Sequence, residues 1–402
     1  MNEHLLTMGT KIADRLADPA QHPQLTEPAL FIHQSMTGGA GVALLHIQRA
    51  LAGADWEPAC RWIAAAARGG VSAADQAGLY IGAPAVALAL HTANADGQDR
   101  FTVARDEINR RVTDLAHRRV TTARTRMRRY LAAFREYDLG YGLTGIGALL
   151  LRTEPGGDAL GRILEYLVAL TNPIRVDDVF LPGWWADHDP DPATPTPDGH
   201  ANLGIAHGIT GPLALLGLAT RAGIEVEGQR TAIEAIRTFL DSWRQEHEAG
   251  PWWPEWITRS ELAAARPAHD HPPRPSWCYG ATGIARAQQI AAIALGDTGW
   301  QREAETALAA NLAPERLAEI TDPGLCHGIA GITHTLHRAA ADAITPALPA
   351  LLPALTEQLA AVDPDTVGAD LLDGAAGIAL TAHTLTHETP TTWRWDTCLL
   401  TA

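Results

Sequence analysis

The hydrophobic and polar positions of this chain alternate between two kinds of helical segment. One kind begins at a Gly-x-x-Gly, or a close variant, and continues as an aliphatic, alanine-rich run. The other carries an apolar stripe with charged residues between its members, as in residues 160–168 and 233–243. A run that is apolar all round predicts a buried helix, and a striped one predicts a surface helix. Strand signals are weak throughout, so the pattern predicts an all-α fold.

The Gly-x-x-Gly start recurs seven times along the chain. Its first glycines are Gly38, Gly82, Gly142, Gly208, Gly280, Gly328 and Gly374. The second copy departs from the pattern, with Pro84 and Ala85 after Gly82. A unit of roughly 45 residues has the size of a two-helix repeat. Seven buried and seven amphipathic helices, without a polar capping repeat at either end, favour a closed double ring over an open solenoid. We therefore expect one domain spanning residues 1–402.

The longer intervals between repeats predict insertions. Residues 91–135 contain an Arg-rich stretch, which predicts either a solvated helix face or a docking surface for an acidic peptide. Residues 184–200 and 250–275 are rich in Pro, Asp and Trp and are expected to form loops. Long loops in a compact helical domain commonly border the functional face.

Composition excludes several classes of protein. The net charge of −15 and the pI near 5.5 argue against a nucleic-acid-binding surface. Four scattered cysteines are too few for a disulfide framework, which favours a reducing cytosol. Residues 1–19 lack the basic head and apolar block of a signal peptide. No window of eighteen uncharged apolar residues occurs, so no transmembrane span is expected.

Polar residues stand just ahead of the first glycine in repeats three to six. They are Asp138, His207, Cys278, Cys326 and His327. If all these helices begin at the same end of a ring, the five side chains converge at one mouth. Sulfur and imidazole are preferred Zn²⁺ ligands, and the positive end of a helix favours a thiolate. Three ligands leave a fourth coordination position for water or substrate, as in catalytic zinc sites.

Each of these residues also has a structural interpretation. Two lone cysteines are often buried hydrophobic residues, but the matching offsets and the adjoining His327 favour a metal site. His207 could be a core or capping histidine, and Asp138 a helix cap. Three further candidates are weaker: Arg274 as a loop arginine, Asp373 as a helix-dipole partner, and His269-Asp270-His271 as a second metal motif.

The motifs together resemble the lanthionine synthetase C-like family of lanthipeptide cyclases. The resemblance covers nearly the whole chain and rests on four motifs besides the seven repeats: Tyr137-Asp138, Asn202-Leu203-Gly204-Ile205-Ala206-His207-Gly208, Arg274-x-x-Trp277-Cys278-Tyr279-Gly280 and Cys326-His327-Gly328. It implies an α/α toroid, a double barrel of seven inner and seven outer helices. It also implies one Zn²⁺ ion held by Cys278, Cys326 and His327.

The same resemblance implies roles for the surrounding residues. His207 would be the leading proton-transfer group, and Asp138 an orienting or thiol-deprotonating partner. Arg274 would be a structural or enolate-facing cation, with Trp277 and Tyr279 in the wall of the site.

The activity that the resemblance implies is the closure of thioether rings. A cysteine thiolate of a dehydrated precursor peptide adds to dehydroalanine or dehydrobutyrine and forms lanthionine or methyllanthionine. The expected partners are this precursor with its leader, a lanthipeptide dehydratase and a transporter. The expected location is the cytoplasm, including the membrane periphery within a synthetase complex.

Three alternatives remain at this point. One is zinc-dependent addition of glutathione or another free thiol to dehydrated peptides. Another is a non-catalytic zinc-bound scaffold of a peptide-modification complex. A six-repeat toroid such as a zinc prenyltransferase is disfavoured because seven units are present.

Overall fold

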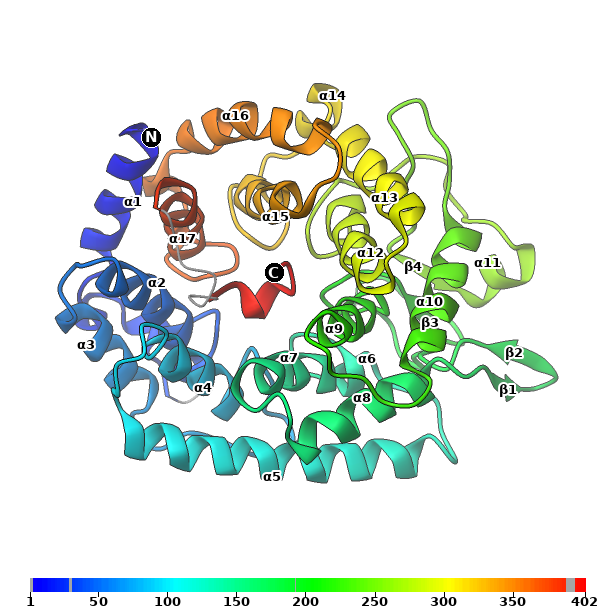
Figure 1. The fold of residues 1–402 in the computed structure, drawn as a ribbon, viewed down its shortest axis with the longest axis horizontal. Coiled ribbons are helices and arrows are strands. Elements are labelled where there is room, and N and C mark those ends of the chain that lie inside the picture. The colour runs from blue at the N-terminus through cyan, green and yellow to red at the C-terminus, as the bar shows by residue number, and fades with distance from the viewer. Residues whose placement is uncertain (1–2, 29–30, 192, 388–394) are drawn as a thin grey trace.

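The computed structural model describes residues 3–28, 31–191, 193–387 and 395–402, and these residues form a closed ring of paired helices (Figure 1). Within this described part, seven helices line the inside of the ring. They are α2 (Gly39–Leu51), α4 (Ala83–Thr92), α7 (Leu143–Thr153), α9 (Thr210–Arg221), α12 (Ala281–Leu295), α15 (Ile329–Asp342) and α17 (Ala375–Thr386). Each packs against the next, and α17 packs against α2, so the ring is closed.

Seven further helices of the described part cover the outside. They are α1 (Glu3–Arg15), α3 (Glu57–Ala66), α5 (Thr102–Arg126), α8 (Asp158–Leu170), α10 (Gln229–Trp243), α13 (Thr298–Asn311) and α16 (Ala347–Ala360). Each inner helix packs on the outer helix that follows it, except that α17 packs on α1 from the other end of the chain. The expected α/α toroid of seven inner and seven outer helices is confirmed.

Short elements connect the two rings. The remaining helices are α6 (Phe134–Tyr137), α11 (Arg259–Ala264) and α14 (Pro314–Leu317), with 3-10 turns η1 (Pro19–Gln21), η2 (Pro23–Leu25), η3 (Ile32–Gln34), η4 (Pro364–Thr366) and η5 (Trp395–Leu399). Strands β1 (Ile174–Val176) and β2 (Val179–Leu181) form a hairpin. Strands β3 (His200–Asn202) and β4 (Trp256–Thr258) pair antiparallel and so tie the regions of the two expected loops, 184–200 and 250–275, to each other. Position 192 of the first loop lies outside the described residues.

The second glycine of the repeat allows the preceding loop to fold back over the first turn of its inner helix. A Cβ atom on Gly283 would lie 2.0 Å from the carbonyl oxygen of Trp277, and one on Gly331 would lie 1.8 Å from that of Leu325. Both distances are far shorter than a carbon–oxygen contact allows. The Gly-x-x-Gly pattern therefore records a close backbone approach that fixes the loop carrying the polar residues.

These loops are joined around the ring by backbone hydrogen bonds. The N–H of a residue just ahead of one inner helix donates to a carbonyl just ahead of the next. The bonds run Met36 to Tyr80, Tyr80 to Gly140, Leu139 to Ala206, Ala206 to Cys278, Cys278 to Cys326 and Cys326 to Leu372. All six lie between 2.9 and 3.3 Å. Residues far apart in sequence are thus placed side by side at one mouth of the ring.

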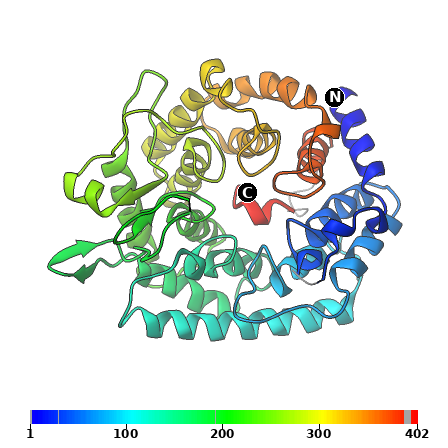
Figure 2. The same ribbon diagram turned by 180° about the vertical axis from the view of Figure 1, so that it is seen from behind.

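The segment 395–402 lies inside the ring and is visible from both sides (Figures 1 and 2). Asp396 is buried between His334 and Arg338, with its Oδ2 atom 3.0 and 2.6 Å from their nitrogens. Burial acts against ionisation, but Arg338 and His334 outweigh it and hold the pKa of Asp396 below its usual value. The inner helix α15 is thereby tied to the segment at the centre.

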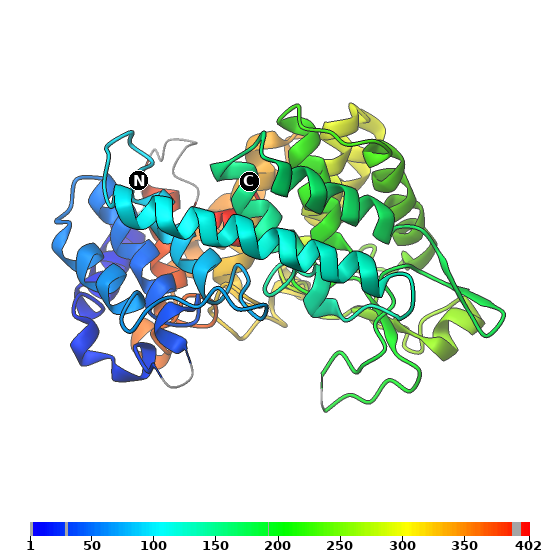
Figure 3. The ribbon, with the colours of Figure 1, turned by 90° about the horizontal axis from the view of Figure 1, so that it is seen from below.

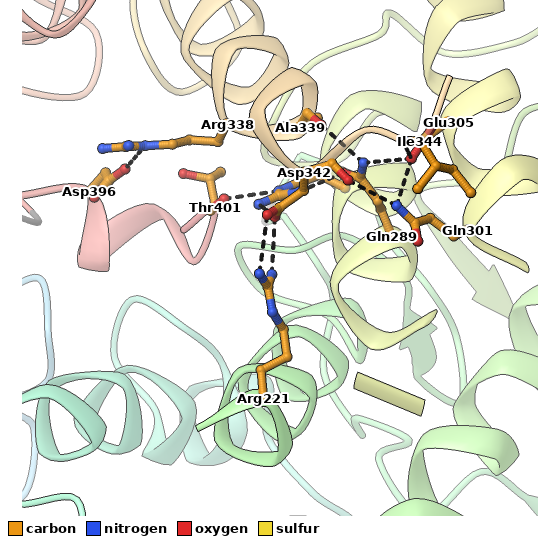
Figure 4. A network of polar contacts seen from close by, with 11 residues as sticks. Arg221, Gln289, Gln301, Glu305, Arg338, Ala339, Asp342, Ile344, Asp396 and Thr401 are labelled. Carbon is orange, nitrogen blue, oxygen red and sulfur yellow. Dashed lines mark hydrogen bonds and ion pairs between the residues drawn. The ribbon is translucent and has the colours of Figure 1, made fainter. Parts of the chain in front are cut away.

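A second polar network holds the same segment from α12. Arg286, which is only 1% exposed, donates its Nε–H to the carbonyl of Thr401 at 2.9 Å. It also pairs with Asp342, whose other partner is Arg221 (Figure 4). Because a buried arginine without partners is costly, these contacts fix how α9, α12 and α15 pack around the centre.

The Arg-rich stretch forms most of α5, which lies along the outside of the ring as the outer partner of α4 (Figure 3). Its arginines are partly neutralised in place. Arg118 pairs with Asp75, Arg124 with Glu165 and Arg126 with Glu136. The stretch is therefore part of the toroid wall. In the described part of the chain, no helix combines the length and the apolar character needed to cross a membrane.

Candidate functional site

Cys278, Cys326 and His327 come together where the loops ahead of α12 and α15 meet. One ligand atom from each lies within 4.8 Å of the others. The Cys278 N–H donates to the carbonyl of Cys326 at 3.2 Å, so the two loops are in direct contact. Cys278 is buried, while Cys326 and His327 are partly exposed. The predicted ligand set is therefore assembled at a place that an incoming molecule can reach.

The pKa values of the two thiols are shifted in opposite directions. The hydrogen bond with Cys326 lowers the pKa of Cys278 well below its usual value against the effect of burial, and His327 adds to the lowering. The same hydrogen bond, together with burial, raises the pKa of Cys326. The first proton thus leaves easily and the second with difficulty. Two thiolates at this distance require a cation to balance their charge.

This donor set fits Zn²⁺. Two thiolates and one imidazole are borderline-soft ligands of the type that zinc prefers, and they are too few to close a tetrahedron. Among the described residues, no other group of His, Cys, Asp and Glu side chains is arranged to hold a metal. The weaker candidate His269-Asp270-His271 is not such a group, and its Asp270 and His271 side chains are highly exposed.

His207 and Asp138 form a pair beside the cysteines. The Nδ1 atom of His207 lies 2.7 Å from Oδ2 of Asp138, and the other carboxylate oxygen accepts the N–H of Tyr141 at 2.8 Å. Asp138 is fully buried, whereas the side chain of His207 is 28% exposed. With Nδ1–H donated to the carboxylate, Nε2 is the nitrogen left to exchange a proton with a substrate.

Aromatic rings surround His207 and connect it with the cysteine loop. The rings of Phe134, Tyr141 and Tyr279 have their centroids 5.1, 6.4 and 6.0 Å from the imidazole. Tyr279 follows Cys278 directly, and the N–H of Ala206 donates to the carbonyl of Cys278. Burial raises the pKa of Tyr279, so its hydroxyl stays protonated and remains a hydrogen-bond donor.

Two charged groups border the site from the 250–275 region. Arg274 is exposed, and its positive charge acts to lower the pKa of Cys326. Glu255 is partly buried, and burial together with the nearby Cys278 raises its pKa, while Arg274 opposes this shift. The sequence motif singled out Arg274 but not Glu255, which has no fixed offset from a repeat glycine.

Trp277 is placed differently from the other expected site residues. Its side chain is only 1% exposed, and its indole N–H donates to the carbonyl of Leu399 at 3.0 Å. Trp277 therefore faces the segment at the centre of the ring, while Cys278 belongs to the cluster with Cys326 and His327. Its expected place in the site wall is better described as a support behind that wall.

Comparisons with known proteins bear on the family and the fold of this chain. A family model described as lanthionine synthetase C-like protein matches residues 34–400. Nisin biosynthesis protein NisC of Lactococcus lactis subsp. lactis is 27% identical over 137 residues, which are 34% of this chain. The match spans only 32% of that relative's length. The solved structure of a nisin cyclase is 20% identical and covers 97% of both chains with a TM-score of 0.80, which shows the same fold.

Proposed function

The chain belongs to the lanthionine synthetase C-like family, and from this premise we propose that it is a zinc-dependent lanthipeptide cyclase. Its reaction adds a cysteine thiol of a precursor peptide to a dehydroalanine or dehydrobutyrine of the same peptide. A C–S bond forms at Cβ, the C=C bond is lost, and Cα gains the proton that the thiol gives up. The product is a lanthionine or methyllanthionine ring.

One observation carries this proposal. A cluster of three soft ligands and a histidine oriented by a carboxylate come from four consecutive repeats and meet at one mouth of the toroid. Cys278, Cys326 and His327 are the residues that would hold the metal. When bound there, Zn²⁺ acidifies a coordinating thiol so that it reacts as the thiolate.

His207 is the proton-transfer group of the proposal. The buried carboxylate of Asp138 holds its Nδ1–H, so that Nε2 accepts a proton in one step and returns one to Cα in another. Asp138 also accepts the backbone N–H of Tyr141, which prevents the carboxylate from turning away. The role of Asp138 is therefore orientation, because its side chain is fully buried whereas that of His207 is partly exposed.

Two groups are suited to stabilise the enolate that forms before Cα is protonated. Tyr279 retains its hydroxyl proton because burial raises its pKa, and its ring lies 6.0 Å from that of His207. Arg274 supplies a permanent positive charge next to the cysteine pair. Donors and cations at the place where negative charge develops lower the barrier of such additions.

The substrate defines the partners of the reaction. A peptide that already carries dehydrated residues must come from a dehydratase, so we propose a dehydrated precursor with its leader as the substrate and a lanthipeptide dehydratase as the preceding enzyme. A transporter would export the cyclised product. All four cysteines are free thiols, which supports a location in the reducing cytoplasm, including the membrane periphery.

The proposal is tested with purified protein, added Zn²⁺ and an enzymatically dehydrated precursor peptide. Ring closure leaves the peptide mass unchanged but removes its free thiols, which are counted by alkylation and mass spectrometry. We expect one zinc per chain and loss of alkylation. Cys278→Ala abolishes both zinc binding and cyclisation, whereas Cys60→Ala, which removes an exposed cysteine far from this cluster in sequence, changes neither.

Two results would overturn the proposal. Ring formation by a zinc-free Cys278→Ala protein would exclude the metal centre as its cause. Addition of glutathione in preference to the peptide's own cysteine, seen as a mass increase when both are offered, would indicate the intermolecular reaction instead.

A further inference from the structure

His327 lies between two carboxylates that its sequence motif does not include. Its Nε2 atom is 3.2 Å from Oδ2 of Asp322, and its Nδ1 atom is 3.8 Å from Oδ1 of Asp373. Both are ion-pair distances, and the contact of Nε2 with Asp322 is the closer one. The two ring nitrogens are therefore not equivalent, and the structure distinguishes them before any metal is considered.

Asp322 is held firmly in position by the loop that also carries the ligands. Its Oδ1 atom accepts the N–H of Gly324 at 2.7 Å, and its carbonyl accepts the N–H of Ile329 at 3.0 Å in the first turn of α15. A Cβ atom on Gly328 would lie 2.3 Å from the same carbonyl oxygen, so the loop closes tightly at this point. Oδ2 is the carboxylate oxygen left to face His327.

We propose that Asp322 is a positioning residue of the metal site: its carboxylate accepts the Nε2–H of His327 and thereby leaves Nδ1 as the metal-binding nitrogen. The inference rests on the proposed function for the presence of zinc at this cluster. Histidines that bind metals commonly donate the other ring N–H to a carboxylate, which fixes the tautomer and strengthens the metal bond. Asp322 acts through His327 and need not touch the substrate.

Asp373 is not the carboxylate that positions His327. It occupies in the seventh repeat the offset that His327 has in the sixth, but its carboxylate is 54% exposed and lies outside the three-residue cluster. Asp373 is therefore a neighbour of the nitrogen that binds the metal, and Asp322 is the partner of the other.

The substitution Asp322→Asn tests the tautomer directly. Asparagine keeps an oxygen for the N–H of Gly324 and presents an amide N–H to Nε2, which reverses the polarity of the contact with His327. Nδ1 then carries the proton, and zinc must displace it. We expect the zinc affinity of the full chain, measured by competition with a chromophoric chelator, to fall about 10- to 100-fold.

The matched control is Asp370→Asn. Asp370 accepts the N–H groups of Leu372 and Asp373 at 2.9 Å with one carboxylate oxygen, in the same kind of turn one repeat later. Its substitution removes one charge from the neighbourhood of the site and leaves the partner of His327 intact. Zinc affinity close to that of the unsubstituted protein is expected. Asp322→Glu retains a carboxylate acceptor and should recover part of the lost affinity.

A second measurement needs no Asp322 variant. Nitrogen-15 NMR of the zinc-loaded protein, with the signals of His327 assigned from their absence in His327→Gln, reports which ring nitrogen bears the metal and which the proton. We expect metal on Nδ1 and a proton on Nε2. The reverse assignment overturns the inference, even if Asp322→Asn fails to fold.

The remaining outcomes separate this inference from the proposed function. Unchanged zinc affinity in folded Asp322→Asn, or a loss found in Asp373→Asn instead, overturns the inference while the cyclase proposal stands. Absence of stoichiometric zinc in the unsubstituted protein overturns both. Zinc bound equally well by Cys278→Ala also overturns both, because the cluster would then not be the metal site.

Discussion

The imidazole of His207 donates Nδ1–H to the buried carboxylate of Asp138 across 2.7 Å, although 69 residues separate them in the chain. The contact exists because the loops ahead of α7 and α9 are adjacent in the ring, where Leu139 donates its N–H to the carbonyl of Ala206. A carboxylate in this position fixes the tautomer of the histidine. The pair therefore has the geometry of an oriented general acid–base group, with Nε2 as the ring nitrogen that the carboxylate does not occupy.

Substitution of Asp138 by Asn is expected to lower turnover and preserve zinc. The amide keeps an oxygen for the N–H of Tyr141 and turns its NH₂ toward Nδ1, so the proton moves to Nε2 and His207 can no longer accept one there. A loss of about 10²- to 10⁴-fold in the cyclisation rate is expected, the range for general acid–base groups. Cyclisation is followed by thiol alkylation and zinc content by elemental analysis. Loss of zinc in this variant would place Asp138 in the metal site instead.

The repeat glycines of the inner helices are expected to be intolerant of alanine. In Gly331→Ala the new methyl carbon would lie 1.8 Å from the carbonyl oxygen of Leu325, so the loop carrying Cys326 must move. We expect a loss of unfolding free energy of about 1–3 kcal/mol, as for overpacked sites, and weaker zinc binding. Thermal unfolding and chelator competition measure the two effects.

Gly161→Ala is the control for that substitution. Gly161 lies in the outer helix α8, where a Cβ atom would meet no other atom within 4 Å and where the φ angle is not positive. Alanine there should stabilise the helix by about 0.5–1 kcal/mol, because glycine loses more backbone entropy on folding. Equal behaviour of the two variants would contradict the close approach of loop and helix at Gly331.

Much of this organisation could be predicted from the sequence because it repeats. The apolar runs opened by Gly-x-x-Gly predicted the inner helices. The offset that Cys278 shares with Cys326, and the one that His207 shares with His327, predicted their convergence at one mouth. The partner of His327 could not be found this way, since Asp322 stands six residues ahead of Gly328, beyond the offsets compared. The direction of Trp277 also escaped prediction, because spacing along a loop does not determine which way each side chain points.

The centre of the ring was likewise beyond the reach of the repeat pattern. The segment 395–402 follows the last inner helix and has no counterpart in the other repeats, so no periodicity marks it. Its contacts come from single polar residues inside apolar helices, such as Arg286 on α12 and His334 on α15. In the sequence these two residues only interrupt an apolar run. In the structure Arg286 contacts Thr401 and His334 contacts Asp396.

Stability is expected to fall as the pH drops from about 6.5 to about 4. Burial lowers the pKa of His46 to about 4 and that of His200 to about 4, so the folded protein holds both rings neutral while the unfolded chain protonates them near 6.5. In this interval the unfolded state binds more protons, and stability therefore rises with pH. Each proton contributes a slope of about 1.4 kcal/mol per pH unit. Urea unfolding at several pH values measures this dependence of the unfolding free energy on pH.

His46→Gln isolates one of these protons. Glutamine retains an N–H donor for the carbonyl of Leu16, which His46 contacts at 2.8 Å, but it does not titrate. The dependence of unfolding free energy on pH should become shallower by about one proton between pH 4 and 6.5. An unchanged slope in His46→Gln would show that other groups cause the acid sensitivity.

Trp277→Phe is expected to loosen the wall behind the metal cluster. The substitution removes the indole N–H that donates to the carbonyl of Leu399 and leaves that buried oxygen without this donor. A loss of about 1–3 kcal/mol in unfolding free energy is expected.

Trp184→Phe is the matched control, because Trp184 is also buried but its indole N–H has no hydrogen-bond partner among the described residues. Thermal and urea unfolding compare the two. Because Trp277 directly precedes Cys278, only Trp277→Phe should also weaken zinc binding, and a similar effect of both variants on zinc would assign the change to general loosening of the core.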